Sequence, residues 1–530
     1  LNLSDFNKKI AAIVATEPAP FIYERLGEKY HHYLIDEFQD TSTTQWHNLL
    51  PLVDNSLANG NYNMIVGDAK QAIYRWRGGE VEQIIAFPKV FGHNNNPLLL
   101  EREESLDRNF KKKELNTNYR SKAEIVDFSN QFFQSVAPHL LDKYAELYKN
   151  LNQKFEPTNI GGGIEILGFS GINDKNKEDT ELYKFKTLNY VLEKVDECVK
   201  SNYKLKDIAV LCRNNKNAVE IAEFLLSNGK NVISSESLLL NNSKEVTFLL
   251  DIMRYLTNTS DIKYQVKIMD YLTTRVYNET LFEQYQSKDL LTYLKSKNIH
   301  FSFNKIANYS LYELVEELIL LFNLDKTVNL YIQFFIDKAH EYASKNDNSI
   351  LNFIDWWELK SEKFSVVMPE GMDAVKVMTI HKSKGLEFPV VIYPYADTVV
   401  KKGEDYFWTD ELELQNLKAA VLPIKEELVN TKFAEAYNEE MDKAKLDLTN
   451  MVYVAFTRPK DRLYIITKRG VNNSKNGSVG DYLLDYCLTK TENKIGDFHY
   501  KFGLFNDKKK EKEEDKEEAL VFNAVTYNNW

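Results

Sequence analysis

Residues 33–42 read YLIDEFQDTS, an apolar run followed at once by acidic side chains. Tyr33, Leu34 and Ile35 predict a buried strand, and Asp36 and Glu37 stand where that strand ends. Two adjacent carboxylates at this place suit NTP hydrolysis, because one can hold Mg2+ and the next can polarise the attacking water. The plainer alternative is a helix N-terminus, where an acidic pair is also common.

The same order of apolar strand and polar loop returns in MIVGDAKQAIYRWRGGE, residues 64–80. Gln71 lies in that loop, where it is placed to sense a γ-phosphate. Aromatic rings and cations then alternate at Tyr74, Arg75, Trp76 and Arg77. This mixture suits single-stranded DNA, since bases stack on aromatic rings for about 1–3 kcal/mol each and arginines pair with phosphates. The alternative is that Trp76 belongs to the core.

A third segment, LNTNYRSKAEIV at residues 115–126, begins a helix. Ser121 and Glu124 predict a capping box, which leaves Tyr119 and Arg120 in the loop before the helix. An arginine in such a loop can reach a phosphate on a neighbouring domain, and a tyrosine there can stack on a purine. A surface salt bridge of Arg120 is the alternative.

The fourth segment, VKVMTIHKSKGLEFPVVIYP at residues 375–394, predicts a strand, a polar loop and a second strand. Its loop offers donors for phosphate and a carboxylate for ribose hydroxyls, on Thr379, His381, Lys384, Gly385 and Glu387. A structural role is the alternative for His381, as for any lone histidine.

The last segment, LDLTNMVYVAFTRPKDRLYIIT at residues 446–467, predicts a helix followed by a strand. Leu448, Met451, Val452 and Ala455 share one helical face. Arg458 comes at the helix end, where Pro459 stops the helix. This is a good position for an arginine finger.

The composition places the chain among globular proteins with several domains, because 530 residues with 43% apolar side chains exceed one core. The net charge of −11 argues against a general coating of nucleic acid, so a DNA contact would be a local groove. No membrane-spanning run or signal peptide is evident. Three scattered cysteines do not form a disulfide framework, which favours a reducing cytoplasm.

The order of the patterns predicts an α/β fold with parallel sheets. Apolar runs alternate with helical patterns from Tyr33 to about Phe133 and from Ile164 to about Leu240, and strand signals return at 375–378, 390–393 and 463–467. Residues 241–365 instead predict an all-helical insertion, in which Ser310 and Glu313 form a capping box. Residues 508–518, KKKEKEEDKEE, predict a solvated tether.

Taken together and in this order, DEFQDT, GDxxQxIYRWRG, NYRS, TxHxSKGLEF and YVAFTR resemble motifs two to six of superfamily 1 helicases of the UvrD/Rep/RecB type. The resemblance implies ATP and Mg2+ as ligands and two RecA-like motor domains of the P-loop NTPase class. Residues 1–106 would form the second half of the first motor domain, and 107–240 with 366–505 the second, interrupted by the helical insertion. Residues 506–530 would be a linker or the start of a nuclease domain.

The resemblance also implies a role for each matching residue. Asp36 would bind magnesium, Glu37 would be the general base, Tyr119 would stack on adenine and Glu387 would contact the ribose. Gln71, Arg120 and Arg458 would sense the γ-phosphate, and Gly385 would lie in the nucleotide loop. Single-stranded DNA would be held by Tyr74, Trp76, Arg77, Thr379, His381 and Lys384.

Within the family, Lys70 stands where UvrD and Rep usually carry aspartate, which resembles the RecB/AddA branch. That branch implies a helicase-nuclease acting on DNA ends in recombinational repair, with an AddB/RecC-like partner subunit. Thr449 and Asn450 depart from the arginines of UvrD. The sequence contains no GxxxxGK[ST] loop, so we expect residues 1–530 alone to be nearly inactive. The alternative is a non-catalytic DNA-binding or scaffold module with a decayed motor.

Overall fold

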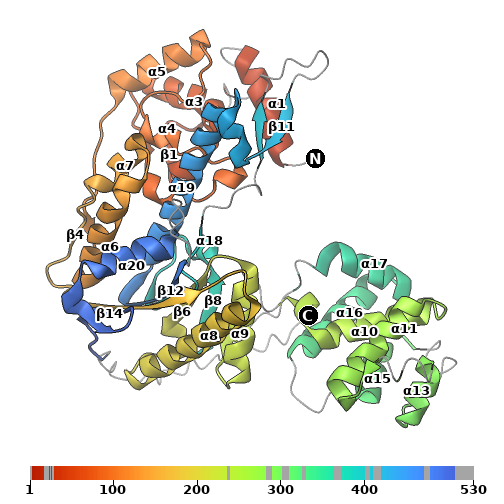
Figure 1. Cartoon of the computed structure of the whole chain (residues 1–530). Helices are drawn as coiled ribbons and strands as arrows, with labels where there is room; N and C mark the ends of the chain where they lie inside the picture. The colour runs from red at the N-terminus through yellow and green to blue at the C-terminus, as the bar shows by residue number, and fades with distance from the viewer. Residues whose placement is uncertain are drawn as a thin grey trace, which may run out of the picture.

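The computed structural model describes most of the chain, in ranges separated by short gaps. The described residues are 3–16, 23, 26, 29–234, 239–281, 284, 289–300, 309–324, 330–361, 364, 372–399, 406–409, 419–470 and 478–507. They form three groups of elements (Figure 1). We call the described residues of 3–109 the N-terminal part, those of 110–234 and 372–507 the sheet part, and those of 239–364 the helical part.

The N-terminal part is built on two short parallel strands, β1 (Leu34–Ile35) and β2 (Met64–Ile65). Helices α1 (Leu3–Thr16), α3 (Thr43–Ala58), α4 (Glu82–Ile85) and α5 (Pro97–Asn109) surround them. A small core holds this part together through Phe38, Trp46, Leu50, Val53, Val90, Leu99 and Leu106. The polar loops that follow β1 and β2 therefore leave from neighbouring strand ends.

The sheet part contains an eight-stranded sheet in the order β13-β14-β5-β12-β9-β6-β8-β7. Six strands are parallel: β5 (Gly162–Ile172), β12 (Pro459–Gly470), β9 (Phe388–Tyr393), β6 (Ile208–Cys212), β8 (Val375–Thr379) and β7 (Val232–Ile233). At one edge β14 (His499–Leu504) pairs antiparallel with β5, and β13 (Lys494–Gly496) pairs antiparallel with β14. The fold is thus mixed α/β with a sheet dominated by parallel pairs.

Helices cover both faces of this sheet, which explains why its strands read as unbroken apolar runs. One face packs against α6 (Ala123–Val136), α7 (Asp142–Lys149), α19 (Ala434–Phe456) and α20 (Val479–Leu488). The other face packs against α8 (Lys177–Lys200) and α9 (Asn215–Ser227). Figure 1 shows α19 running from the sheet toward the N-terminal part.

The helical part has a core of its own and lies to the right of the sheet in Figure 1. Its elements are α10 (Lys244–Thr257), α11 (Ile262–Tyr271), the π-helix η7 (Leu272–Tyr277), α13 (Leu290–Ser296), α15 (Leu311–Leu321), α16 (Leu330–Lys345) and α17 (Ile350–Lys360). The predicted capping box of Ser310 and Glu313 is confirmed at the start of α15. Among the described residues between 244 and 361, none belongs to a strand.

Smaller strand pairs complete the fold. An antiparallel hairpin of β10 (Tyr406–Thr409) and β11 (Ala420–Pro423) was not predicted from the sequence. Strands β3 (Thr117–Asn118) and β4 (Lys154–Phe155) pair in parallel. The predicted tether at 508–518 lies outside the described residues. In the described ranges we find no helix with the length and apolar character that a bilayer crossing requires.

Candidate nucleotide and nucleic-acid site

The acidic pair lies at the end of β1, with both carboxylates exposed. Glu37 adopts a left-handed backbone conformation, with φ of 51°, and its amide donates to Asp36 Oδ1 at 2.8 Å. The next long helix, α3, is capped by Ser42 and Gln45 rather than by the acidic pair. Glu37 is the N-cap residue of the short 3-10 helix η1 (Phe38–Asp40), but its side chain makes no capping hydrogen bond. The alternative interpretation, an acidic helix N-terminus, thus describes the position of Glu37 but not a capping role of its carboxylate.

Lys384 of the sheet part reaches the acidic loop of the N-terminal part. Its Nζ lies 3.2 Å from Glu37 Oε2, forms an ion pair with Asp40 and donates to the carbonyl oxygen of Gln71 at 2.9 Å. The side chain is only 6% exposed. Burial raises the pKa of Asp40, and Lys384 opposes that rise. We expected Lys384 at nucleic acid, but its ammonium instead joins the two parts through carboxylates.

Gln71 ends the single turn of 3-10 helix η2 (Ala69–Gln71). Its Nε2 donates to Asp68 Oδ2 at 3.2 Å, and its Oε1 accepts from Arg458 Nη2 at 3.5 Å. The structure thus brings together two residues for which the sequence predicted one task, although they are 387 positions apart.

Arg458 is buried, with 1% of its surface exposed. Its guanidinium donates to the carbonyl oxygens of Val454 and Leu386, to Thr457 Oγ1 and to Gln71 Oε1, all of which are neutral. Within the described residues it forms no ion pair with a carboxylate. Burial lowers the pKa of Arg458 to about 10, and the nearby charge of Arg120 pushes it in the same direction. The charges of Glu37 and Glu387 act in the opposite direction on this pKa, although neither carboxylate forms an ion pair with the guanidinium. A buried cation without a bonded counter-ion is costly, so the site favours an anion.

Arg120 lies beside Arg458 and is partly exposed. Its Nε donates to Glu387 Oε2 at 2.9 Å and its Nη1 to the carbonyl oxygen of Thr457 at 3.4 Å. Lys460 also pairs with Glu387 and is the main cause that lowers the pKa of this carboxyl group, with Arg120 adding to the effect. The ribose role of Glu387 stays a prediction: each of its oxygens has one cation as partner and keeps a further lone pair that can accept from a hydroxyl.

The loop before α6 presents Tyr119 to solvent, with 75% of its surface exposed, as a stacking residue requires. The capping box predicted there is wrong. Helix α6 begins at Ala123 without a side-chain cap, and Ser121 Oγ donates to the carbonyl oxygen of Pro459 at 2.7 Å. That bond ties the loop to the start of β12, directly after Arg458. Gly385, in the loop before β9, has φ of +80°, a conformation that favours glycine.

An aromatic and cationic surface forms where η3 (Arg75–Arg77) meets α18 (Ile380–Ser383). Trp76 is 67% exposed, so it is not a core residue, and its ring lies 6.1 Å from that of His381. The Arg77 guanidinium stacks 4.6 Å above Trp76, and Tyr74 OH donates to the carbonyl oxygen of His381 at 2.9 Å. Residues predicted to hold DNA thus converge from both parts. Thr379, also predicted there, is buried.

Two arginines near this surface differ from the sequence interpretation. Arg75 points to α19, where it pairs with Glu440 at 2.7 Å and Asp447 at 2.6 Å, so it is not free for a phosphate. Burial opposes its charge, but the two carboxylates outweigh burial and raise its pKa. Arg213 was missed: it follows β6, and its charge adds to burial in lowering the pKa of His381. A basic residue directly after a parallel strand was the available signal.

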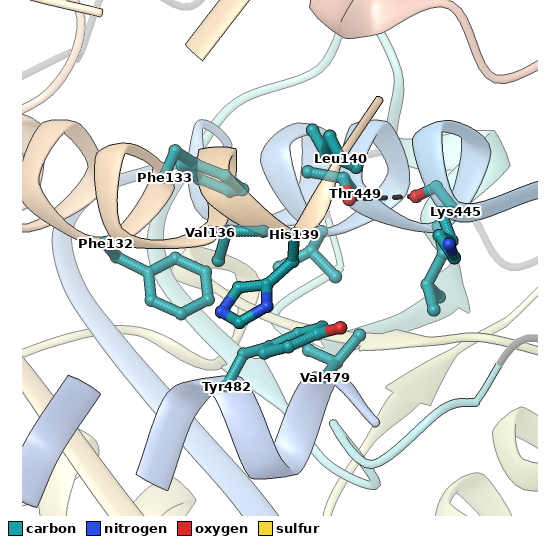
Figure 2. A pocket seen from close by; sticks show the side chains of 11 residues that line it. Phe132, Phe133, Val136, His139, Leu140, Lys445, Thr449, Val479 and Tyr482 are labelled. Atoms are coloured by element: carbon teal, nitrogen blue, oxygen red, sulfur yellow. Dashed lines mark hydrogen bonds between the residues drawn. The ribbon is translucent and has the colours of Figure 1, made fainter. Parts of the chain in front are cut away.

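Two cavities differ in what they could hold. The one in Figure 2 lies between α6, α19 and α20, is lined by Phe132, His139, Thr449 and Tyr482 among others, and has a volume of about 30 Å³. That is room for water, not for a nucleotide. A second cavity, of about 500 Å³, lies mainly between α1 and α3 and is bordered by Glu37 and Asp40, whereas Gln71, Arg120 and Arg458 do not line it. Its size is in the range of small-molecule sites.

The fold and this cluster place the chain in the class of superfamily 1 helicases. Residues 1–92 match the family model of the UvrD/REP helicase N-terminal domain, and residues 113–298 and 298–470 match that of the UvrD-like helicase C-terminal domain. The chain therefore belongs to the UvrD-like helicase family.

Relatives support this assignment. The exonuclease/helicase subunit RexA of Lactococcus lactis subsp. cremoris is 25% identical, over 88% of this chain and 43% of that protein. An ATP-dependent helicase/nuclease subunit of Carboxydothermus hydrogenoformans is 26% identical, over 84% and 41%. The ATP-dependent DNA helicase PcrA of Bacillus subtilis is 25% identical, over 76% and 55%. The chain thus spans about half the length of the relatives it matches.

Proposed function

We propose that the full-length protein is an ATP-driven single-stranded DNA translocase and helicase. In this proposal the phosphates of ATP lie between Asp36 and Glu37 on one side and Arg120 and Arg458 on the other, each side on its own RecA-like motor domain. The observation that carries the proposal is the buried guanidinium of Arg458, which has neutral partners only among the described residues. The γ-phosphate of ATP would supply the missing negative charge, and release of the phosphate after hydrolysis would remove that charge.

The acidic pair fits magnesium chemistry, since exposed carboxylate oxygens are the ligands that Mg2+ prefers. No group of three or more potential metal-binding side chains occurs in the described part of the chain. Asp36 would therefore hold the ion together with phosphate oxygens and water, as is usual for Mg2+ at nucleotides. A bound ion supplies charge neutralisation at the phosphates. Glu37 would orient and deprotonate the attacking water, and Tyr119 would stack on the adenine.

Single-stranded DNA is proposed to lie across Tyr74, Trp76, Arg77 and His381. The exposed tryptophan offers a stacking face, and Arg77 lies beside it to meet a phosphate. Tyr74 also supports coupling between the sites, because it lies in the segment that follows Gln71 and bonds to the backbone of His381. ATP hydrolysis would thus change the grip on a base.

The biological role proposed is DNA end resection in recombinational repair, in the cytoplasm, with an AddB/RecC-like partner subunit. The names of two relatives, exonuclease/helicase subunit RexA and ATP-dependent helicase/nuclease subunit, support this role. Lys70, at the position of aspartate in UvrD and Rep, supports the same branch.

The test is Glu37→Gln in the full-length protein, which keeps the shape of the side chain and removes the base. DNA-stimulated ATP hydrolysis should fall by about a hundredfold or more, while ATP binding persists. Glu104→Gln, exposed on α5, makes the same chemical change away from the site and should change neither. A parent protein that binds DNA but never hydrolyses ATP, in any variant, would instead favour the scaffold alternative.

A further inference from the structure

The loop that carries Gln71 is held in place by side chains of the sheet part. Asn450 Nδ2 donates to the carbonyl oxygen of Ala69 at 3.0 Å and to that of Ala72 at 2.9 Å. Lys384 Nζ donates to the carbonyl oxygen of Gln71 itself at 2.9 Å. The turn also has bonds of its own, from Gln71 and Lys70 to Asp68. The bonds from Asn450 and Lys384 add a direct connection of this loop to the sheet part.

Asn450 is fully buried, and both the nitrogen and the oxygen of its amide group form hydrogen bonds. Its Oδ1 accepts from Tyr148 OH at 2.6 Å. Burial raises the pKa of Tyr148 well above its usual value, so this hydroxyl stays protonated. The carbonyl groups of Ala69 and Ala72 can only accept, which requires the amide nitrogen of Asn450 to face them and its oxygen to face Tyr148. The side chain therefore has one orientation.

This arrangement gives one helix two contacts at the predicted γ-phosphate position. Asn450 lies on α19, and Arg458 follows the end of the same helix. Asn450 donates hydrogen bonds to the carbonyl oxygens of Ala69 and Ala72, before and after Gln71. Arg458 Nη2 donates to the Gln71 side chain at 3.5 Å. A movement of α19 would therefore shift the guanidinium of Arg458 and act on the loop of Gln71 through the bonds of Asn450.

We propose that Asn450 is a positioning residue that keeps Gln71 in register with Arg458 during the ATP cycle. This inference rests on the proposed function, because it needs the two parts to move while ATP is hydrolysed. Asparagine suits the position, since it supplies two N–H donors for the loop and an acceptor for Tyr148. The arginine of UvrD has no acceptor. An arginine at this position could not accept from Tyr148.

Thr449 provides a matched control on the same helix. It is about as buried as a core residue, at 9% exposed, and its hydroxyl donates to the carbonyl oxygen of Lys445 within α19 at 2.9 Å. Figure 2 shows Thr449 and Lys445 at the small cavity beside α6. Thr449→Val therefore removes a buried polar group from α19 without touching the loop of Gln71.

The experiment compares Asn450→Ala and Thr449→Val in the full-length protein. The first readout is amide hydrogen exchange of residues 68–77, and the second is steady-state ATP hydrolysis with and without single-stranded DNA. With Asn450→Ala, the loop amides should exchange about tenfold faster because two buried carbonyl groups lose their donors. The DNA-stimulated kcat should fall about tenfold, with the KM for ATP changed less than about twofold. Thr449→Val should change none of these.

Equal exchange in the two variants, or an unchanged kcat with Asn450→Ala, would overturn the proposal. Should Asn450→Ala fail to fold, Tyr148→Phe replaces it, because the ring keeps its packing and only the bond to Oδ1 is lost. Its effects should have the same direction and be about threefold. If the unmodified protein hydrolyses no ATP, the proposed function fails, and the exchange comparison alone then decides whether Asn450 holds the loop.

Discussion

Replacing Trp76 by alanine tests whether the aromatic surface holds single-stranded DNA. A base stacked on an aromatic ring contributes about 1–3 kcal/mol, which corresponds to a loss of about fivefold to 150-fold in affinity. Because Trp76 is already 67% exposed, its removal should cost the fold little. The main loss is the stacking of Arg77 on its ring, worth about 0.5–1 kcal/mol at an exposed site. DNA affinity should therefore change far more than thermal stability.

The assay is equilibrium binding of the full-length protein to labelled oligonucleotides across a salt series. The Trp76→Ala defect should persist at high salt, whereas Arg77→Ala should act through a phosphate and lose its effect as salt rises. ATP affinity should hardly change in either variant. Trp46→Ala is the contrasting control, since Trp46 is 1% exposed in the core and its loss should cost about 3–5 kcal/mol of stability. Normal DNA binding by Trp76→Ala, with a lowered melting temperature, would refute the reasoning.

Three further predictions concern charge and catalysis. Burial opposes ionisation of Glu165, but hydrogen bonds from His499, Tyr190 and Lys194 lower its pKa to about 2. A carboxyl group with a lowered pKa stabilises the folded state at pH values above its unfolded pKa, and this stabilisation is lost as pH falls toward the folded pKa. Glu165→Gln should thus cost about 3 kcal/mol at pH 7, and its melting-temperature deficit should close between pH 4.5 and 2. Lys384→Met should lower the free energy of unfolding by about 1–3 kcal/mol at pH 7, because Asp40 loses its counter-ion. The loss should shrink as pH falls and Asp40 is protonated. Adding Asp40→Asn should restore the free energy of unfolding, and no recovery would contradict the pairing. Residues 1–530 alone should show no DNA-stimulated ATPase, because they contain no phosphate-binding loop; turnover abolished by Glu37→Gln would contradict this.

Local patterns predicted several strands of the sheet and some helix ends correctly, although Leu34 of β1, predicted to be buried, is exposed. The apolar runs at 375–378, 390–393 and 463–467 lie within β8, β9 and β12, and α19 ends just before Arg458 and Pro459. These features depend on side chains near in sequence, such as an apolar face or a proline. The boundaries of the predicted domains, by contrast, stay predictions.

A local pattern failed where a distant partner competed for the same group. Ser121 and Glu124 have the spacing of a capping box, but Ser121 Oγ bonds to the carbonyl oxygen of Pro459, 338 positions away. The β10–β11 hairpin was missed because its strands have only four residues each and pair mainly with one another. Sequence spacing shows what a side chain can reach nearby, and tertiary packing decides what it meets.

The cations of the site show the same limit for function. In the sequence, Arg75, Lys384, Arg120 and Arg458 are all candidate partners of a phosphate, either of ATP or of DNA. In the structure Arg75 forms ion pairs with Glu440 and Asp447. Lys384 forms ion pairs with Glu37 and Asp40, and Arg120 forms one with Glu387. Arg458 is the most buried of the four and, in the part of the chain that the structure describes, has no carboxylate partner. Because a buried positive charge is stabilised most by the anion that it lacks, Arg458 is the residue from which the nucleotide should gain most.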